Sequence, residues 1–194
     1  MLNDKLKQYN IVLGSASPRR KDLLTGLEVE FTIITTQKEE KYPKNLEKKE
    51  VAEFLAKQKA DSIAKDLQKC YLLITADTIV TKNSEIIHKP KDKQDAINIL
   101  RKLSADSHEV ITGVCIKSAK KEVVFSSTTK VFFSNLSDDE INFYIERYKP
   151  FDKAGSYGIQ EWIGFIGIEK IIGSYNNVVG LPTDELYQKL KLFT

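Results

Sequence analysis

A short strand-turn-helix pattern near the amino terminus constrains the fold of this chain more than any other stretch. The apolar residues Ile11–Leu13 predict a buried strand, and the small residues directly after them predict a turn. Ser17 has the side chain of a helix N-cap, and Pro18 suits the first position of the helix that would follow. A chain that begins with such a unit is expected to mix strands and helices.

Three cations occupy the predicted first turn of this helix: Arg19, Arg20 and Lys21. The helix dipole is already positive at this end, so three successive cations need a compensating partner. A bound polyanion would supply it, held by backbone N–H groups, by guanidinium groups and by the hydroxyls of Ser15 and Ser17. The pattern therefore indicates a ligand that carries phosphate.

The rest of the chain alternates between strand-like and helix-like segments. Strands are predicted at 31–34, 71–76, 109–116 and 123–133, a short hairpin at 84–88, and helices at 18–26, 51–66, 92–103, 137–147 and 183–190. The strand at 71–76 is expected to lie parallel to the first one, and 109–116 and 123–133 to pair with each other. The fold class is therefore α/β: one domain over residues 1–194, with a mixed central sheet and flanking helices in two lobes around a cleft.

Charge and cysteine content exclude several classes of protein. The net charge is only +3, from 30 basic and 27 acidic residues, which argues against a nucleic-acid partner. Cys70 and Cys115 lack a CxxC pattern or a neighbouring histidine, so both are expected to be buried free thiols in a reducing cytoplasm. The amino terminus has no long apolar segment of the kind found in signal sequences, and no apolar stretch approaches the length of a membrane span, so no membrane partner is expected.

Two acidic positions follow predicted strands, where open α/β sheets bind ligands. Asp77 follows the strand at 71–76, and Glu39-Glu40 follows the strand at 31–34. Two carboxylates that meet at one point would hold Mg²⁺ for a polyphosphate substrate, and Asp77 would also activate water. The alternatives are a turn or N-cap role for Asp77 and plain surface charge for the glutamates, which lie in or beside a charged loop at 38–49.

Other polar residues allow both a binding role and a structural one. Lys89 precedes Pro90 and is either a positioned phosphate ligand or a solvated lysine. Lys57 and Lys59 lie on one predicted helix, where either both are solvated or one faces the cleft. Gln160 ends a glycine-rich stretch and would read the imide of uracil or thymine, unless it only caps a turn. Neither His88 nor His108 accompanies a serine or cysteine nucleophile motif, and the two are not spaced like a pair of metal ligands. A catalytic triad and a zinc site are therefore not indicated.

Taken together, the motifs are similar to those of the Maf family of nucleotide pyrophosphatases, whose fold is related to inosine-triphosphate pyrophosphatase. They occur in the family's order along nearly the whole chain: Gly14-Ser15-Ala16-Ser17-Pro18-Arg19-Arg20, Ala76-Asp77-Thr78-Ile79-Val80, Lys89-Pro90, Leu103-Ser104, Thr112-Gly113-Val114, Asp152-Lys153-Ala154-Gly155-Ser156-Tyr157-Gly158-Ile159-Gln160 and Gly173-Ser174-Tyr175-Asn176-Asn177-Val178-Val179-Gly180-Leu181-Pro182. Each piece alone is weak evidence, but the joint match is specific. Two departures are His88 before Lys89 and Glu161-Trp162-Ile163 after Gln160, where the family more often has glycine-containing segments.

The resemblance implies hydrolysis of a nucleoside triphosphate to the monophosphate and pyrophosphate, a house-cleaning reaction that uses Mg²⁺, Mn²⁺ or Co²⁺. Arg19, Thr78 and Gln160 match the subfamily that prefers dTTP and UTP. By the same resemblance Asp77 is catalytic and Glu40 and Asp77 hold the metal. The residues expected to contact the substrate are Ser15, Arg19, Arg20, Lys59, Thr78, Lys89 and Gln160.

The resemblance also allows for a homodimer. Two alternative functions stay open: a 7-methyl-GTP pyrophosphatase, and a nucleotide-binding regulator of septum formation. The retained set of Asp77, Glu40 and Lys89 argues against the second. A substrate panel and an assay for pyrophosphate release would separate all three functions.

Overall fold

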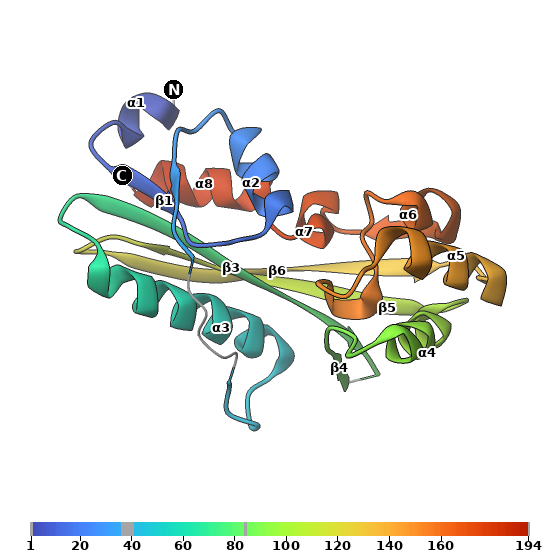
Figure 1. The fold of residues 1–194 in the computed structure, drawn as a ribbon. Coiled ribbons are helices and arrows are strands. Elements are labelled where there is room, and N and C mark those ends of the chain that lie inside the picture. Colours follow the sequence, from blue (N-terminus) through green and yellow to red (C-terminus); the bar gives the residue numbers. More distant parts are fainter. Residues whose placement is uncertain (1, 36–40, 84, 194) are drawn as a thin grey trace. The chain divides into compact units, whose positions relative to one another are not determined.

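A computed structural model describes residues 2–35, 41–83 and 85–193 (Figure 1). The chain divides into two compact units, and three strands have residues in both: β3 (Tyr71–Lys82), β5 (Ser107–Lys117) and β6 (Glu122–Phe133). The first unit consists of Met1–Asp77, Thr112–Ser127 and Gly180–Thr194, and the second of Thr78–Ile111 and Thr128–Val179.

The first unit contains a sheet with the strand order β2-β1-β3-β5-β6. Its strands are β1 (Asn10–Leu13), β2 (Thr32–Ile33) and parts of β3 (Tyr71–Lys82), β5 (Ser107–Lys117) and β6 (Glu122–Phe133). Strand β1 pairs in parallel with both β2 and β3, which confirms the predicted direction of the early strands. Parallel neighbours need a crossover connection, and the helices α2 and α3 lie in the two segments that provide it.

Helices cover both faces of this sheet. They are α1 (Leu2–Leu6), α2 (Pro18–Thr25), α8 (Thr183–Phe193) and α3 (Lys48–Ile63), which continues into the 3₁₀ helix η1 (Ala64–Asp66). Strand side chains alternate between faces, and β3 shows this directly. Leu72 and Ile74 pack in one apolar cluster with residues of α1, α2 and α8, whereas Leu73 packs in another with residues of α3. The unit is therefore a three-layer arrangement (Figure 1).

Small residues bring α3 very close to the sheet. A Cβ on Gly113 of β5 would lie 2.2 Å from the carbonyl carbon of Ala52, so only glycine fits at that point. Ala52, Ala56 and Ala60 of α3 are all fully buried. The hydroxyl of Thr75 donates a 2.7 Å hydrogen bond to the carbonyl of Ala56, which fixes α3 along β3.

The second unit contains the remaining parts of β3, β5 and β6, flanked by β4 (Glu85–Ile87) and β7 (Ile168–Ile172), in the order β4-β3-β5-β6-β7. Strands β4 and β7 pair antiparallel with β3 and β6 respectively. The helical segments are α4 (Lys93–Leu103), α5 (Asp138–Tyr148), η2 (Ala154–Ser156), α6 (Trp162–Gly167) and α7 (Tyr175–Val179). A single apolar cluster unites these strands with α4 and α5.

The α/β fold class is confirmed, as are most of the predicted elements. The predicted caps are also present, since Asp92 caps α4 and Ser137 forms a capping box with Glu140 at the start of α5. The elements that were not predicted are α1, η2, α6, β7 and α7.

Two predictions were wrong. Strand β3 does not end at Ala76 but continues to Lys82, so Asp77 lies inside a strand rather than after it. The β-branched residues that follow Asp77 favour this extension, and β4 pairs with its last part. Cys70 is exposed rather than buried, because it lies in the turn before β3 with a left-handed φ of 74°; Cys115 is buried, and both thiols are free. Within the described residues, every helix is too short or too polar to cross a membrane.

Candidate functional site

The turn between β1 and α2 has the local structure that its sequence predicts. Ser17 is the N-cap of α2, and its hydroxyl accepts a 3.4 Å hydrogen bond from the backbone N–H of Arg20. The hydroxyl of Ser15 accepts a 3.2 Å bond from the backbone N–H of Ser17. Both serines therefore shape the turn, and the backbone at the start of α2 presents N–H groups where an anion would be stabilised.

Arg20 is held in a defined orientation by the first unit itself. Its Nε donates a 2.8 Å bond to the carbonyl of Gly180, and its Nη1 lies 3.4 Å from the hydroxyl of Ser15. Arg19 precedes it in the first turn of α2 and, like Arg20, is half-buried. Two guanidinium groups are thus concentrated at the amino end of one helix, as expected for a site that takes a polyanion.

Asp77, the predicted catalytic carboxylate, is deeply buried. Its side chain is 7% exposed and pairs with the ammonium group of Lys59, which is 19% exposed. A buried carboxylate is stable only when its charge is compensated, and Lys59 supplies that compensation. The two residues come from β3 and α3, which the Thr75–Ala56 hydrogen bond and the Gly113 contact hold together.

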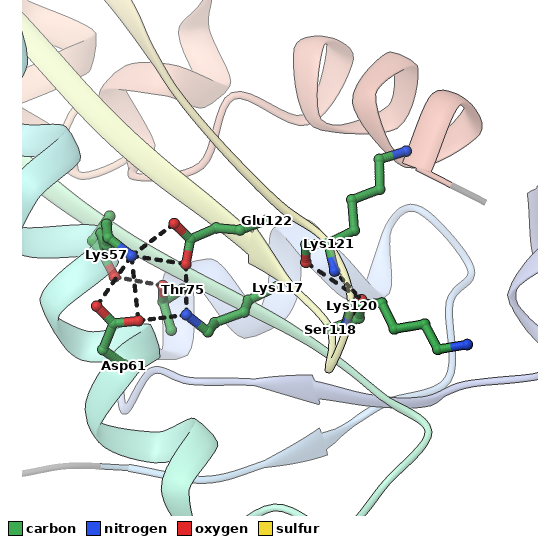
Figure 2. Close-up of polar contacts among 9 residues, drawn as sticks. Lys57, Asp61, Thr75, Lys117, Ser118, Lys120, Lys121 and Glu122 are labelled. Atoms are coloured by element: carbon green, nitrogen blue, oxygen red, sulfur yellow. Dashed lines mark hydrogen bonds and ion pairs between the residues drawn. The ribbon is translucent and has the colours of Figure 1, made fainter.

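The structure distinguishes Lys59 from Lys57, which the sequence could not. Lys57 belongs to a network with Asp61, Lys117 and Glu122 near the β5–β6 turn, where its Nζ lies 2.7 Å from Glu122 (Figure 2). The partly exposed charges of this network raise the pKa of Lys57 and lower the pKa of Glu122. Lys57 is therefore engaged in a surface ion network, whereas Lys59 pairs with the buried Asp77.

A close backbone approach brings the β1–α2 turn next to the strand that carries Asp77. The N–H of Gly14 donates a 2.8 Å bond to the carbonyl of Ile74, and a Cβ on Gly14 would lie 2.6 Å from the methyl group of Thr75. Ser15 thus follows directly after the last β1–β3 contact, and Asp77 lies two residues beyond Thr75. Strand β1 ends beside Ile74 while β3 continues past that point, so the turn between β1 and α2 and the Lys59–Asp77 pair both lie at the carboxyl end of β1.

The second unit carries the other predicted contacts. Thr78 follows Asp77 within β3 and is half-buried, whereas Lys89 lies exposed beyond β4. Gln160 lies just before α6, and its Oε1 is buried without a hydrogen-bond donor in the described part of the chain.

The predicted metal site is described only in part. Glu40, its neighbour Glu39 and the start of the charged loop at 38–49 lie outside the described residues. Over residues 2–35, 41–83 and 85–193, no group of three or more histidine, cysteine, aspartate or glutamate side chains could hold a metal ion. Asp77 is thus the only predicted metal ligand that lies within the described residues.

The buried histidine of the second unit, His108, belongs to an aromatic cluster in the core. His108 is buried, and its Nε2 lies 2.7 Å from the Tyr157 hydroxyl within a cluster that also contains Phe133. Burial lowers the pKa of His108 to about 4, with a smaller contribution from the positive charge of Lys82. This histidine is therefore a neutral core residue at physiological pH.

Sequence reasoning missed one polar network near Gln160. The Tyr144 hydroxyl bonds to the carboxylate of Glu161, which also pairs with Lys153 at 3.1 Å. The only sequence signal was the unusual Glu161 after Gln160, because Tyr144 lies on α5 and its partners, Gly158 and Glu161, are 14 and 17 residues away.

Nearly the whole chain is similar to known proteins. A family model described as Maf-like protein matches residues 10–193. A dTTP/UTP pyrophosphatase of Flavobacterium psychrophilum is 49% identical over 187 residues, which are 96% of this chain and 96% of that protein. A protein with the same name from Porphyromonas gingivalis is 49% identical over 193 residues, covering 98% of this chain and 97% of the relative.

Among solved structures, the Ham1 protein of Staphylococcus aureus superimposes with a TM-score of 0.56. The two chains are 16% identical, and the match covers 95% of this chain and 100% of the other. This likeness supports the α/β fold.

Proposed function

The chain belongs to the Maf family, and we propose that it hydrolyses dTTP and UTP to the nucleoside monophosphate and pyrophosphate. Full-length relatives at 49% identity carry the name of this activity. The observation that carries the proposal is the buried Lys59–Asp77 pair beside a cationic strand-turn-helix unit. A carboxylate and a concentration of cations are what hydrolysis of a phosphoanhydride needs.

In this proposal Asp77 orients the attacking water and accepts its proton. A new bond forms between the water oxygen and the α-phosphorus, and the bond from the α-phosphorus to the bridging oxygen breaks. The electron pair of that bond leaves with the pyrophosphate, whose negative charge rises. Lys59 keeps the Asp77 side chain in one orientation and balances its charge before the substrate arrives.

The cations of the first unit stabilise the triphosphate and the developing charge. Arg20 is already oriented by Gly180 and Ser15, so little side-chain freedom is lost when it binds phosphate. Arg19 adds a second guanidinium at the same helix end. Thr78 and Lys89 are proposed to contact the substrate, as the family resemblance implies. Each charge-assisted hydrogen bond of this kind contributes about 1.5–3 kcal/mol.

The donor chemistry at Asp77 fits a hard divalent cation such as Mg²⁺, which prefers one or two carboxylates together with phosphate oxygens and water. The ion pair of Asp77 with Lys59 uses Oδ1, and the carboxylate has a second oxygen, Oδ2. Asp77 and Glu40 would hold the ion, which would neutralise phosphate charge when bound. Mn²⁺ or Co²⁺ would suit the same oxygen ligands.

Gln160 is proposed to contact the base. Its buried Oε1 would accept a hydrogen bond from the imide N–H of uracil or thymine.

We further propose a cytoplasmic house-cleaning role, which the free, exposed thiol of Cys70 suits, and assembly as a homodimer. Size-exclusion chromatography with light scattering would test the dimer, and a monomer at working concentration would reject it.

A substrate panel tests the proposed reaction. Purified protein is incubated with dTTP, UTP, 5-methyl-UTP, 7-methyl-GTP and dCTP in the presence of Mg²⁺, and phosphorus NMR identifies the products. Monophosphate and pyrophosphate should appear fastest with dTTP and UTP. Release of orthophosphate, or a preference for 7-methyl-GTP, would reject the proposal, as would unchanged turnover after EDTA treatment.

A further inference from the structure

A polar network in the second unit surrounds the backbone on both sides of Gln160. Tyr144 is fully buried on α5, and its hydroxyl donates a hydrogen bond to Oε2 of Glu161. The same hydroxyl accepts a 3.0 Å bond from the backbone N–H of Gly158. Gly158 and Glu161, the two ends of the segment that contains Gln160, are thus connected through one oxygen atom.

This segment is a closed turn. The N–H of Glu161 donates a 3.0 Å bond to the carbonyl of Gly158, and the N–H of Gly164 donates a 2.8 Å bond to the carbonyl of Glu161. A Cβ on Gly164 would lie 1.7 Å from the carbonyl oxygen of Ile159, so α6 begins in direct contact with the turn. The backbone of Gln160 is therefore fixed from both sides.

The network includes buried charges. The side chain of Lys153 is 9% exposed, and its Nζ lies 3.1 Å from Oε1 of Glu161, whose side chain is 18% exposed. Both carboxylate oxygens of Glu161 are therefore engaged, one by Tyr144 and one by Lys153. Burying such a pair costs solvation, and apolar residues often support a fold equally well, so a charged network at this point is more than the fold requires.

The side chain of Gln160 contains a buried acceptor without a hydrogen-bond donor in the described part of the chain. Its Oε1 is buried, and no donor among residues 2–35, 41–83 and 85–193 reaches it. A buried acceptor without a donor costs about 1–3 kcal/mol. A ligand with an N–H group would remove that cost.

We propose that Tyr144, Lys153 and Glu161 are positioning residues that fix the turn so that Gln160 Oε1 accepts the N–H of a uracil or thymine base. The inference rests on the proposed function. It adds that discrimination between pyrimidines depends on a network that does not itself touch the base. Cytosine has the same ring size but an acceptor nitrogen where uracil and thymine have an N–H, so dCTP is the matched competitor.

The test compares kcat/KM for dTTP and dCTP in the full-length protein and in Tyr144→Phe. This change removes only the bridging oxygen. The dTTP/dCTP ratio of kcat/KM should fall about tenfold, which corresponds to about one hydrogen bond. Tyr148→Phe is the control, because Tyr148 lies on the same helix and stacks on Tyr144 at 5.2 Å between ring centroids, and its ratio should be unchanged.

A double-mutant comparison separates positioning from general loosening. If Tyr144 acts through Gln160, Tyr144→Phe should leave the ratio unchanged in a Gln160→Ala background. An equal fall in both backgrounds, or no fall in either, overturns the inference. Glu161→Gln provides a second variant should Tyr144→Phe fail to fold; it keeps an acceptor for Tyr144 but removes the charge opposite Lys153, and it too should lower the ratio.

Different results would reject the proposed hydrolysis of dTTP and the proposed positioning role. If the unmodified protein releases no pyrophosphate from dTTP, the proposed function fails and the inference falls with it. If the unmodified protein prefers dTTP over dCTP and both variants keep that preference, only the positioning role is wrong.

Discussion

Acid should destabilise this protein well above the pH at which carboxylates titrate, because of one buried histidine. His108 is 2% exposed and lies between Phe133 and Tyr157, with centroid distances of 5.2 and 5.4 Å. Burial disfavours its charged form, and the positive charge of Lys82 adds to this effect, while Asp106 opposes it. The folded protein therefore holds His108 neutral down to a pKa of about 4, against 6.5 for an ordinary histidine.

The direction of the change in stability with pH follows from where His108 binds its proton. Between pH 6.5 and about 4 the unfolded chain binds a proton at this histidine and the folded chain does not, so unfolding is favoured as the pH falls. Proton linkage with these values lowers the free energy of unfolding by about 2 kcal/mol between pH 7.5 and pH 5. The loss approaches about 3 kcal/mol below pH 4.

Urea unfolding at pH 7.5 and pH 5 measures this loss, with His108→Gln and His88→Gln as matched variants. These are the two histidines of the chain, and His88 is exposed. The free energy of unfolding of His108→Gln should change by about 2 kcal/mol less than that of the unmodified protein over this interval. His88→Gln should keep the full loss. An equal loss in His108→Gln and the unmodified protein would refute the argument.

Four other outcomes are expected. Asp77→Asn should reduce dTTP turnover by about 10²–10⁴-fold, with its circular dichroism spectrum unchanged; near-normal rates would exclude Asp77 as the group that activates water. Lys59→Met should abolish most turnover, whereas Lys57→Met should keep turnover and lose less than about 1 kcal/mol of stability, since its ion pairs are partly exposed. Gly113→Ala should lose about 3 kcal/mol or more in chemical denaturation, because its Cβ would lie 2.2 Å from Ala52. Gly26→Ala, whose Cβ would make an ordinary 3.4 Å contact, should stay within about 1 kcal/mol of the unmodified protein.

The sequence alone was sufficient for features that depend on neighbouring residues. The β1–α2 turn, the Ser17 N-cap and the Ser137 capping box follow from side chains within three or four positions of one another. Hydrogen bonds of this range form in the same way wherever the motif occurs, so the pattern predicts them. The parallel pairing of β1 with β3 was also predictable, because two apolar strands joined by a long connection that contains helices favour that arrangement.

Tertiary structure decided every feature that depends on distant residues. Asp77 lies inside β3 because β4 pairs with the end of that strand, and Lys59 rather than Lys57 meets Asp77 because Gly113 and Thr75 fix the position of α3. The links from Tyr144 and Lys153 to Glu161 likewise join separate segments of the chain. Nothing local distinguishes a lysine that will face a buried carboxylate from one that will face solvent. The difference arises only when packing removes water from one of them and makes its ionic partner necessary.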